Sequence, residues 1–483
     1  MTALTVGSES WWQSKNGPEW RQEADGDYQV TFWWRDPQGD ENRSPVRRVW
    51  VYITGVTDHH QNVLPQTMQR ITGTDVWQWC TRLSGNWRGS YCFIPSDRDD
   101  IFADLKPGVT PDRAALREGW RQLLPLAIAD PLNPLSWRGG RGHAVSALEM
   151  PQAPAQPGWD DPQPPLSAPV LLQWRSRRLG NTRRVWVFTS TENTDDERPL
   201  AILLDGQFWA ESMPVWPALT SLTRRRELPP AVYVLIDAID IAQRSRELPC
   251  NADFWLAVQE ELLPQVSAVA PFSDRPERTI VAGQSFGGLA SLYAGLKWPA
   301  RFGCVLSQSG SYWWPHRGGQ QAGAIIEQLK AGELCAQGLR IILEAGVNEP
   351  LILRANQALY AQLHTTQQSV FWRQVDGGHD ALCWRGGLMQ GLIDLWRPLG
   401  RTGDLPRQEL SMEFTNPFDN PQGQFYILQN SQRQFSLWPQ QCALPEGWQV
   451  VCEPQSQEAC QQWLESRWTT LVPQHYAVAR EAL

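Results

Sequence analysis

The stretch VAGQSFGGLA at residues 281–290 places a serine hydroxyl between glycines in the pattern G-x-S-x-G. The apolar run RTIVA leads into Ser285, and the helix-like FGGLASLYAGL follows it. In such a strand-turn-helix context, small flanking residues allow a sharp turn that exposes the hydroxyl, and the next backbone N–H can hold an oxyanion. The pattern therefore predicts that Ser285 is a nucleophile for acyl transfer; the alternative is a serine in a structural turn.

A nucleophilic serine needs a histidine base, and after such a turn the chain order is serine, acid, histidine. His379 follows the strand-like SVFWRQV and the turn DGG, so a loop at a strand end would present it to Ser285. We therefore predict that His379 is the base. The other histidines after the serine are expected on a surface helix, in the C-terminal tail and in a substrate loop, at His364, His475 and His316, respectively.

The orienting acid is harder to place from the sequence. Glu349 comes after the strand-like LRIILEAG, in a loop from which it could reach the imidazole, and we predict it as the acid. A negative charge that merely stabilises a helix N-terminus is the alternative for this residue. The other candidates are Glu344, Asp376 and Asp380, and a Ser–His dyad without a firm acid is a further alternative.

The second oxyanion donor is expected in the loop after an early strand. The segment ILLDGQFWAE provides Gly206 for a tight turn and the N–H of Gln207 as a donor, with the N–H of Phe286 as its partner. Loss of one such donor typically costs about 2.7–4 kcal/mol of transition-state stabilisation. The alternative is an ordinary turn at a strand end.

The elements that position these residues fall into three segments. Residues 28–95 alternate apolar and polar side chains, which predicts an antiparallel, immunoglobulin-like β-sandwich. A helix-like stretch, PDRAALREGWRQLLPLA, follows. Seven prolines between Pro151 and Pro169 then indicate a stiff linker. We expect a first domain at residues 1–168.

From residue 170 to about 399, short apolar runs alternate with helical periods, which predicts a mostly parallel sheet covered on both faces. Ligands should bind beyond the carboxyl ends of its strands. This second domain is placed at residues 169–403. The remaining segment has short strand and turn signals and then a helix-like SQEACQQWLESRW, which predicts a small α+β module at residues 404–483.

The composition narrows the function classes. The net charge of −8 and the pI near 5.5 argue against a general nucleic-acid binder. The nine cysteines are scattered without metal-ligand spacing and their number is odd, so neither a zinc site nor a disulfide framework is indicated, and reduced cysteines in a cytoplasm are expected. The hydrolase domain has no metal-ligand cluster in its sequence, and no metal and no cofactor are expected. The N-terminus lacks a signal-peptide pattern, and no membrane partner is expected. The 27 tryptophans indicate surfaces that bind large aromatic partners; the alternative is that they pack β-domains.

The segments LLDGQFWAE, VAGQSFGGLASLYAGLKWP, EAGVNEP and QVDGGHDALCWRGGL resemble those of enterochelin esterases, the cytoplasmic hydrolases of catecholate siderophores. The resemblance covers both the first and the second domain. It implies an α/β-hydrolase fold that hydrolyses the serine ester bonds of the enterobactin trilactone. Its products would be dihydroxybenzoylserine units, iron release would become easier, and iron would be present only as part of the substrate.

A ferric tris-catecholate is large, aromatic and anionic, so its pocket should offer flat side chains and guanidinium groups. Each candidate has the alternative of being a packing tryptophan or a surface arginine. Together they predict a catecholate site, and they are Trp209, Trp313, Trp314, Trp384, Arg385 and Arg225 within the run Arg224–Arg226.

The tail segments NPFDN, QFSLWP and LPEGW resemble MbtH-like proteins, which bind and activate adenylation domains of nonribosomal peptide synthetases. The resemblance implies a cleft between Trp438 and Trp448, with Ser436 and Leu437 nearby. Gln432 stands where such proteins commonly carry an acid, and WTTLVP departs from their W-T-D-x-R-P ending. These departures concern the contacts of the last segment.

Two other functions are compatible with this sequence. A general acyl or thioester hydrolase of the same fold would act on many small esters. A non-catalytic scaffold would use the tail to dock on a synthetase, with Ser285 vestigial. Fold alone does not separate these functions.

Overall fold

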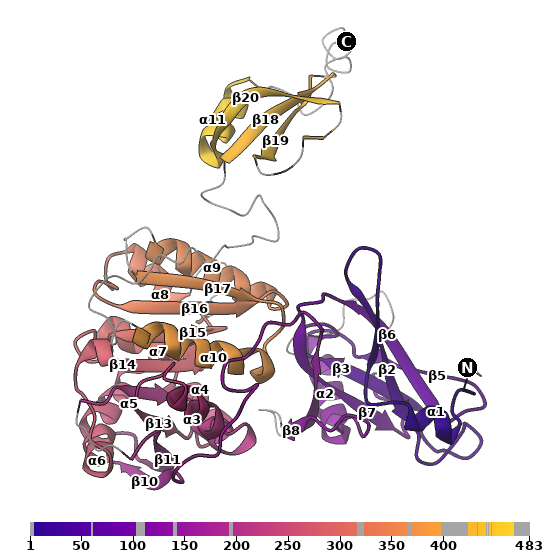
Figure 1. Cartoon of the computed structure of the whole chain (residues 1–483), viewed down its shortest axis with the longest axis horizontal. Coiled ribbons are helices and arrows are strands. Elements are labelled where there is room, and N and C mark those ends of the chain that lie inside the picture. The colour runs from indigo at the N-terminus through magenta and orange to yellow at the C-terminus, as the bar shows by residue number, and fades with distance from the viewer. Residues whose placement is uncertain are drawn as a thin grey trace. The chain divides into compact units, whose positions relative to one another are not determined.

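The computed structural model describes residues 4–58, 61–102, 112–138, 143–192, 197–315, 323–364, 369–397, 424–431, 433–440, 442, 444–445 and 447–467. The chain divides into two compact units, Met1–Gly403 and Asp404–Leu483 (Figure 1). Each unit is described by itself. None of the helices in the described ranges is long and apolar enough to cross a membrane.

The N-terminal domain contains two antiparallel sheets. One has the order β1-β2-β6-β5, formed by Glu19–Gln22, Tyr28–Arg35, Val76–Leu83 and Gln69–Arg70. The other has the order β4-β3-β7-β9-β8, formed by Gln66–Thr67, Arg48–Ile53, Arg88–Ser96, Ala144–Glu149 and Ser136–Arg138. The helical pieces of this domain are α1 (Glu9–Gln13), α2 (Arg113–Leu123) and η1 (Leu124–Leu126).

Alternating side chains hold these sheets together. Along β2 the burial alternates with period two, and Val30 and Phe32 share one core with Val51 and Phe93 of the other sheet. Facing apolar sides of two sheets form a sandwich core in this way. The prediction of a β-rich first domain is therefore confirmed, whereas an immunoglobulin-like connectivity stays a prediction.

The second domain is built on an eight-stranded sheet. Strands β10 and β11 lie at one edge, where β10 pairs antiparallel with β11 and β11 pairs antiparallel with β13. The six strands β12 to β17 pair parallel in the order β13-β12-β14-β15-β16-β17. In sheet order the strands are Val170–Ser176, Asn181–Thr189, Val232–Ile236, Leu200–Leu203, Thr279–Gln284, Cys304–Gln308, Arg340–Gly346 and Ser369–Val375.

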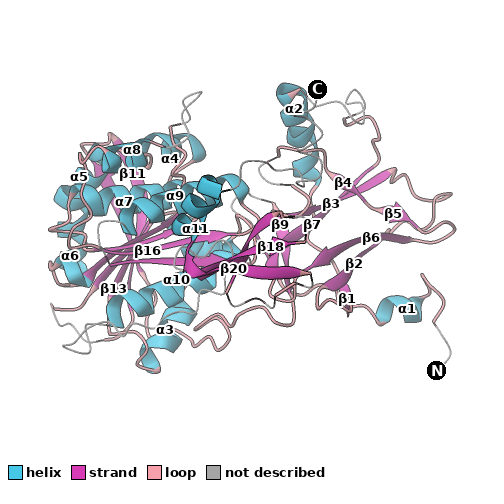
Figure 2. Ribbon diagram, turned by 90° about the horizontal axis from the view of Figure 1, so that it is seen from above, coloured by secondary structure: helices cyan, strands magenta, loops and turns pink. Residues whose placement is uncertain are grey.

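Helices cover both faces of this sheet, because successive side chains of a strand point to opposite sides. Ile202 and Val281 pack with residues of α7 and α9, whereas the neighbouring Ala201 and Ile280 pack with α3 and α10. Figure 2 shows α7 and α8 on one side and α3 on the other. The helices are α3 (Trp216–Arg224), α4 (Ile241–Glu247), α5 (Ala252–Ala257), η3 (Val258–Leu262), α6 (Leu263–Val269), η4 (Pro276–Arg278), α7 (Phe286–Lys297), α8 (Ala324–Lys330), α9 (Pro350–His364) and α10 (Ala381–Trp396).

The proline-rich segment before β10, which the sequence predicts to be a stiff linker, has hydrogen-bond partners in the hydrolase domain. Gln156 is buried and its amide donates to the carbonyl of Leu382 at 2.7 Å. The indole of Trp159 donates to the carbonyl of Arg385 at 2.9 Å. The segment therefore packs along α10 and joins the two domains, because its glutamine and tryptophan find partners there.

The C-terminal unit contains a three-stranded antiparallel sheet with the order β19-β18-β20, formed by Phe435–Pro439, Gln424–Asn430 and Trp448–Ser456. Helix α11 (Gln457–Arg467) packs against it, since its Cys460 is buried with Phe425 and Ile427 of β18. The small core explains how a short segment forms a unit of its own.

Candidate active site

Ser285 occupies a strained turn between β14 and α7. Its backbone angles are φ 60° and ψ −120°, in a region that non-glycine residues rarely adopt. A Cβ atom added to Gly283 would lie 2.4 Å from the carbonyl carbon of Gly287, so the flanking glycines permit the turn. The Ser285 N–H donates to the carbonyl of Gln308 at 3.0 Å, and its Oγ lies 3.3 Å from Oγ of Ser311. The hydroxyl faces the cavity described below.

His379 and Glu349 form a close pair. Glu349 precedes α9, and His379 lies in the loop between β17 and α10; Nδ1 of the imidazole is 2.5 Å from Oε1 of the carboxylate. The carboxylate is buried and also accepts hydrogen bonds from Ser309 Oγ and the Gly346 N–H, each at 2.7 Å. Burial alone would raise the pKa of Glu349, but the charge of His379 and these hydrogen bonds outweigh it and lower that pKa. Glu349 is therefore ionised at neutral pH.

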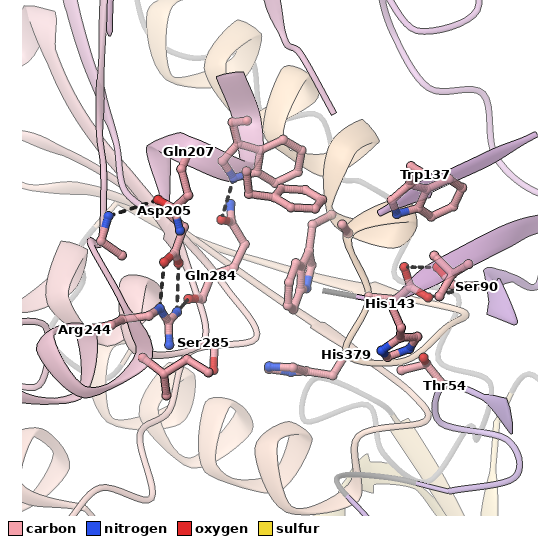
Figure 3. Close-up of a pocket in the computed structure, with 18 of the residues that line it drawn as sticks. Thr54, Ser90, Trp137, His143, Asp205, Gln207, Arg244, Gln284, Ser285 and His379 are labelled. Carbon is pink, nitrogen blue, oxygen red and sulfur yellow. Dashed lines mark hydrogen bonds and ion pairs between the residues drawn. The ribbon is translucent and has the colours of Figure 1, made fainter. Parts of the chain in front are cut away.

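The imidazole ring is directed across the cavity toward Ser285 (Figure 3). Because Nδ1 is hydrogen-bonded to the carboxylate of Glu349, Nε2 is the ring nitrogen on the side of Ser285. In a catalytic triad, the carboxylate fixes the tautomer of the imidazole and Nε2 takes a proton from the serine hydroxyl. The Glu349–His379 pair has the geometry of the first of these roles.

The other carboxylates considered from the sequence have different partners. Glu344 forms an ion pair with Arg373, with Oε2 2.6 Å from Nε of the guanidinium. Asp380 accepts hydrogen bonds from Ser90 and caps the start of α10. Burial raises the pKa of Asp376, and its carbonyl accepts from the Arg88 N–H. Of the alternatives for the histidine, His364 is exposed at the end of α9, while residues 316 and 475 lie outside the described ranges.

Of the two expected oxyanion donors, Gln207 lines the cavity, and Phe286 directly follows Ser285, which also lines it. Gln207 begins a short π-helix, η2 (Phe208–Ser212), just beyond β12, and Phe286 begins α7. Backbone N–H groups at a helix start have no partner within the helix, so they are available to an anion. The side chain of Gln207 is fixed, since its Oε1 accepts from the Ala238 N–H at 3.0 Å. These positions fit donors to a tetrahedral oxyanion.

Both domains of the first unit form the cavity, which has a volume of about 440 Å³. In Figure 3, Ser285, Gln207 and Arg244 lie on one side and Ser90 and Trp137 on the other. The N-terminal domain contributes Tyr52, Thr54, Ser90, Trp137, His143 and Val145. We had not expected these residues from the sequence, because no pattern in the β-domain links them to the serine.

Arg244 is another residue that the sequence analysis missed. Its guanidinium binds Asp205 through two hydrogen bonds, Nε to Oδ1 at 2.6 Å and Nη2 to Oδ2 at 2.8 Å. Burial alone would lower the pKa of Arg244, but the charge of Asp205 outweighs it and raises that pKa. Asp205 has φ 52° and stands two residues before Gln207, so this ion pair braces the loop of the expected oxyanion donor. The only sequence signal was the aspartate in LLDGQ.

Two of the expected substrate residues line the cavity. Trp209 is buried and its indole donates to Gln284 Oε1 at 3.0 Å. Trp384 packs edge-on against His379, with ring centroids 4.7 Å apart, and its indole donates to Ser309 Oγ at 2.9 Å. Trp384 therefore supports the imidazole as well as the cavity wall.

Four expected substrate residues lie elsewhere. The described residues that line the cavity do not include Trp313, Trp314, Arg385 or Arg225. The ring of Trp313 packs on that of Phe286, with centroids 6.0 Å apart, and Trp313 is 38% exposed. Trp314 packs against the hydrophobic core of the hydrolase domain. Arg385 binds Glu149 at 3.0 Å and lies over the Trp159 ring, and Arg225 binds Glu227 at 2.5 Å. Arg385 and Arg225 are thus each held by a nearby carboxylate, and Arg244 is the arginine among the described residues that line the cavity.

In the C-terminal unit, Trp438 and Trp448 are half-buried on strands that flank β18. Trp438 is opposite Tyr426 and Trp448 is opposite Asn430, so their backbones are offset by about 13 Å along the sheet. Ser436 and Leu437 precede Trp438 on β19. A cleft between the tryptophan rings stays a prediction, and residue 432 lies outside the described ranges.

The parallel sheet, the turn at Ser285 and the His379–Glu349 pair define the second domain as an α/β hydrolase. Family models agree along the chain: residues 29–159 match the N-terminal domain of enterochelin esterase, residues 176–395 a putative esterase, and residues 414–480 MbtH-like proteins. The chain belongs to the enterochelin esterase family, is a carboxylic-ester hydrolase and carries an MbtH-like domain.

Individual relatives cover the same segments. The iron(III) enterobactin esterase of Escherichia coli O6:H1 (strain CFT073) is 74% identical over 399 residues, which are 83% of this chain and 99% of that protein. The crystal structure of the enterobactin esterase from Shigella flexneri in the presence of enterobactin shares 72% identity with a TM-score of 0.76, covering 82% of this chain and 100% of that one. Enterobactin biosynthesis protein YbdZ of Escherichia coli K12 is 65% identical over 71 residues, 15% of this chain and 99% of that protein.

Proposed function

We propose that this chain hydrolyses the serine ester bonds of ferric enterobactin and releases dihydroxybenzoylserine units. The observation that carries the proposal is the 74% identity over 399 residues to an iron(III) enterobactin esterase, together with an intact site at Ser285. The cavity is lined by aromatic side chains from both domains, including Trp137, Phe208, Trp209 and Trp384, which suits a substrate with several catechol rings.

The geometry of the site supports the following chemistry. Ser285 Oγ attacks the ester carbonyl carbon while His379 Nε2 takes its proton, and the N–H groups of Gln207 and Phe286 stabilise the resulting oxyanion. Collapse of the tetrahedral intermediate breaks the bond to the alcohol oxygen, which leaves with the proton from His379. Water then attacks the acyl-enzyme with His379 again as base, and the carboxylic acid product leaves Ser285 free.

The reaction as proposed uses no protein-bound cofactor. Iron enters only as part of the substrate, and opening the trilactone separates the catecholate arms that hold it together. Loss of this linkage weakens iron binding, because separate ligands must each lose translational freedom to bind the metal. We propose iron release inside the cell as the physiological consequence.

The discriminating experiment follows hydrolysis of ferric and iron-free enterobactin by chromatography of the trimer, dimer and monomer of dihydroxybenzoylserine. Release of these units supports the proposal. Hydrolysis of small esters without hydrolysis of enterobactin would favour a general acyl or thioester hydrolase. No hydrolysis of either substrate would favour a synthetase-binding scaffold.

We propose in addition that residues 404–483 bind an adenylation domain of a nonribosomal peptide synthetase. The support is the family match at residues 414–480 and the 65% identity to an enterobactin biosynthesis protein. Trp438→Ala should weaken binding of the full chain to such a domain in calorimetry, whereas Val450→Ala, at an exposed position of β20, should not. Equal affinity of both variants would contradict a role for Trp438.

A further inference from the structure

The loop that carries His379 is enclosed by the N-terminal domain. This loop, DGGHD at residues 376–380, lies between β17 and α10 of the hydrolase domain. The N–H of Arg88, at the start of β7, donates to the carbonyl of Asp376 at 3.3 Å. The thiol of Cys383 on α10 donates to the carbonyl of Arg88 at 3.0 Å. Strand β7 thus contacts the chain on both sides of His379.

The closest connection is between Ser90 and Asp380, which are 290 positions apart in the chain. Oδ2 of Asp380 accepts from the Ser90 N–H at 2.6 Å, and Oδ1 accepts from Ser90 Oγ at 2.7 Å and from the Leu382 N–H at 2.8 Å. Both residues are buried. The carboxylate that follows His379 therefore ties β7 of one domain to the start of α10 in the other.

The two glycines of the loop permit this contact. A Cβ atom on Gly378 would lie 2.8 Å from the Thr54 carbonyl oxygen, and one on Gly377 would lie 2.8 Å from the Arg88 carbonyl oxygen. Such distances are too short for real Cβ contacts, and backbone atoms cannot move aside as a flexible side chain does. The two glycines of DGGHD thus allow the backbone of the N-terminal domain to approach the loop closely.

We propose that the N-terminal domain forms part of the active site, and that Ser90 and Asp380 are positioning residues that hold His379 in place. The inference rests on the proposed roles of Ser285 and His379. The base must lie within hydrogen-bond reach of the hydroxyl, and a displacement of about 1 Å can cost about 100-fold in rate. A loop held only by β17 and α10 would lack the third anchor that β7 provides.

The test uses the full chain and a small fluorophosphonate, which reports on the base without a need for the large substrate. Ser285 Oγ forms a bond to phosphorus, the P–F bond breaks, fluoride leaves, and His379 takes the serine proton. Ser90→Ala removes the Oγ donor while keeping the N–H. Ser146→Ala is the matched control, a buried serine on the neighbouring β9 whose Oγ accepts from the Asp130 N–H at 2.9 Å.

Ser90→Ala should slow phosphonylation about tenfold relative to Ser146→Ala at a similar unfolding midpoint, because one of the anchoring hydrogen bonds is lost. The downfield proton resonance of the His379–Glu349 hydrogen bond should shift or broaden in the same variant. Gly378→Ala, which pushes the loop away from Thr54, should act in the same direction.

Equal phosphonylation rates and an unchanged resonance in Ser90→Ala and Ser146→Ala would overturn the positioning role. Ser285→Ala, measured in parallel, separates this failure from failure of the proposed function. If Ser285→Ala still reacts, the nucleophile itself is wrong; if it does not react and Ser90→Ala behaves as the control, only the role of the N-terminal domain fails.

Discussion

Glu349 binds His379 and Ser309 at once, with Oε1 2.5 Å from Nδ1 of the imidazole and Oε2 2.7 Å from Oγ of the serine. Ser309 in turn accepts from the indole of Trp384, whose ring packs against the same imidazole. The imidazole is therefore held both by a carboxylate and by an aromatic ring that share one anchor. This closed arrangement joins the glutamate before α9 to the histidine in the loop after β17.

Glu349→Gln should lower kcat roughly 10³- to 10⁴-fold, because the amide no longer fixes the imidazole tautomer. KM for a small ester should stay within about twofold, since binding does not involve this group. Steady-state hydrolysis of p-nitrophenyl butyrate measures both constants. Glu327→Gln, at an exposed position of α8, is the control. A kcat equal to that of the control would show that another residue orients the imidazole.

Glu349 should also make stability depend on pH. Its folded-state pKa lies below the ordinary value of 4.5, so the unfolded chain binds more protons between the two values. The stabilisation is present above pH 4.5 and is lost as the pH falls through the folded-state pKa. The difference in unfolding free energy between the parent and Glu349→Gln, measured with urea, should therefore shrink on acidification. A constant difference would show that the pKa is not lowered.

Arg244→Lys should lower kcat for small esters about tenfold, because lysine cannot make the paired hydrogen bonds that hold Asp205 and the oxyanion loop. Arg246→Lys, at an exposed position of the same helix, should keep the parental kcat. Steady-state hydrolysis of p-nitrophenyl butyrate measures kcat for both variants. Equal rates for both variants would mean that the ion pair does not brace the donor at Gln207.

Trp137→Ala should raise KM for enterobactin about fivefold, because an aromatic contact worth about 1 kcal/mol is lost from the cavity wall. The same variant should hydrolyse p-nitrophenyl butyrate normally, since a small ester does not reach the N-terminal domain. Trp20→Ala, which removes an exposed ring on β1, is the control. An unchanged KM for enterobactin would place its catechol rings away from Trp137.

Local patterns predicted the strands of the hydrolase domain and the turn at Ser285, because buried parallel strands and the glycine-flanked turn leave short-range signals. The structure brings His379 and Glu349 together as expected from the order of strands, and the family resemblance is confirmed. Loop arginines and tryptophans were less predictable. Arg385 pairs with Glu149 of the other domain, a partner that no local pattern reveals, whereas Arg225 pairs with Glu227 two positions further along the chain.

The contribution of the N-terminal domain could not be predicted for a related reason. Contacts such as Ser90 to Asp380 depend on how two domains pack, and a serine in an alternating strand gives no sign of a partner 290 positions away. The proline-rich segment was predicted only as a stiff linker, and the contacts by which Gln156 and Trp159 hold it against α10 give no local signal. Tertiary packing, not local preference, decides such positions.

Ser285 is the proposed nucleophile that opens the ester bonds of enterobactin. The direct measurement incubates the purified chain and its Ser285→Ala variant with ferric enterobactin and separates the products by chromatography. We expect the parent to release dihydroxybenzoylserine units and the variant, with the same unfolding midpoint, to release at least about 10³-fold less. Undiminished release by Ser285→Ala would show that Ser285 is not the nucleophile.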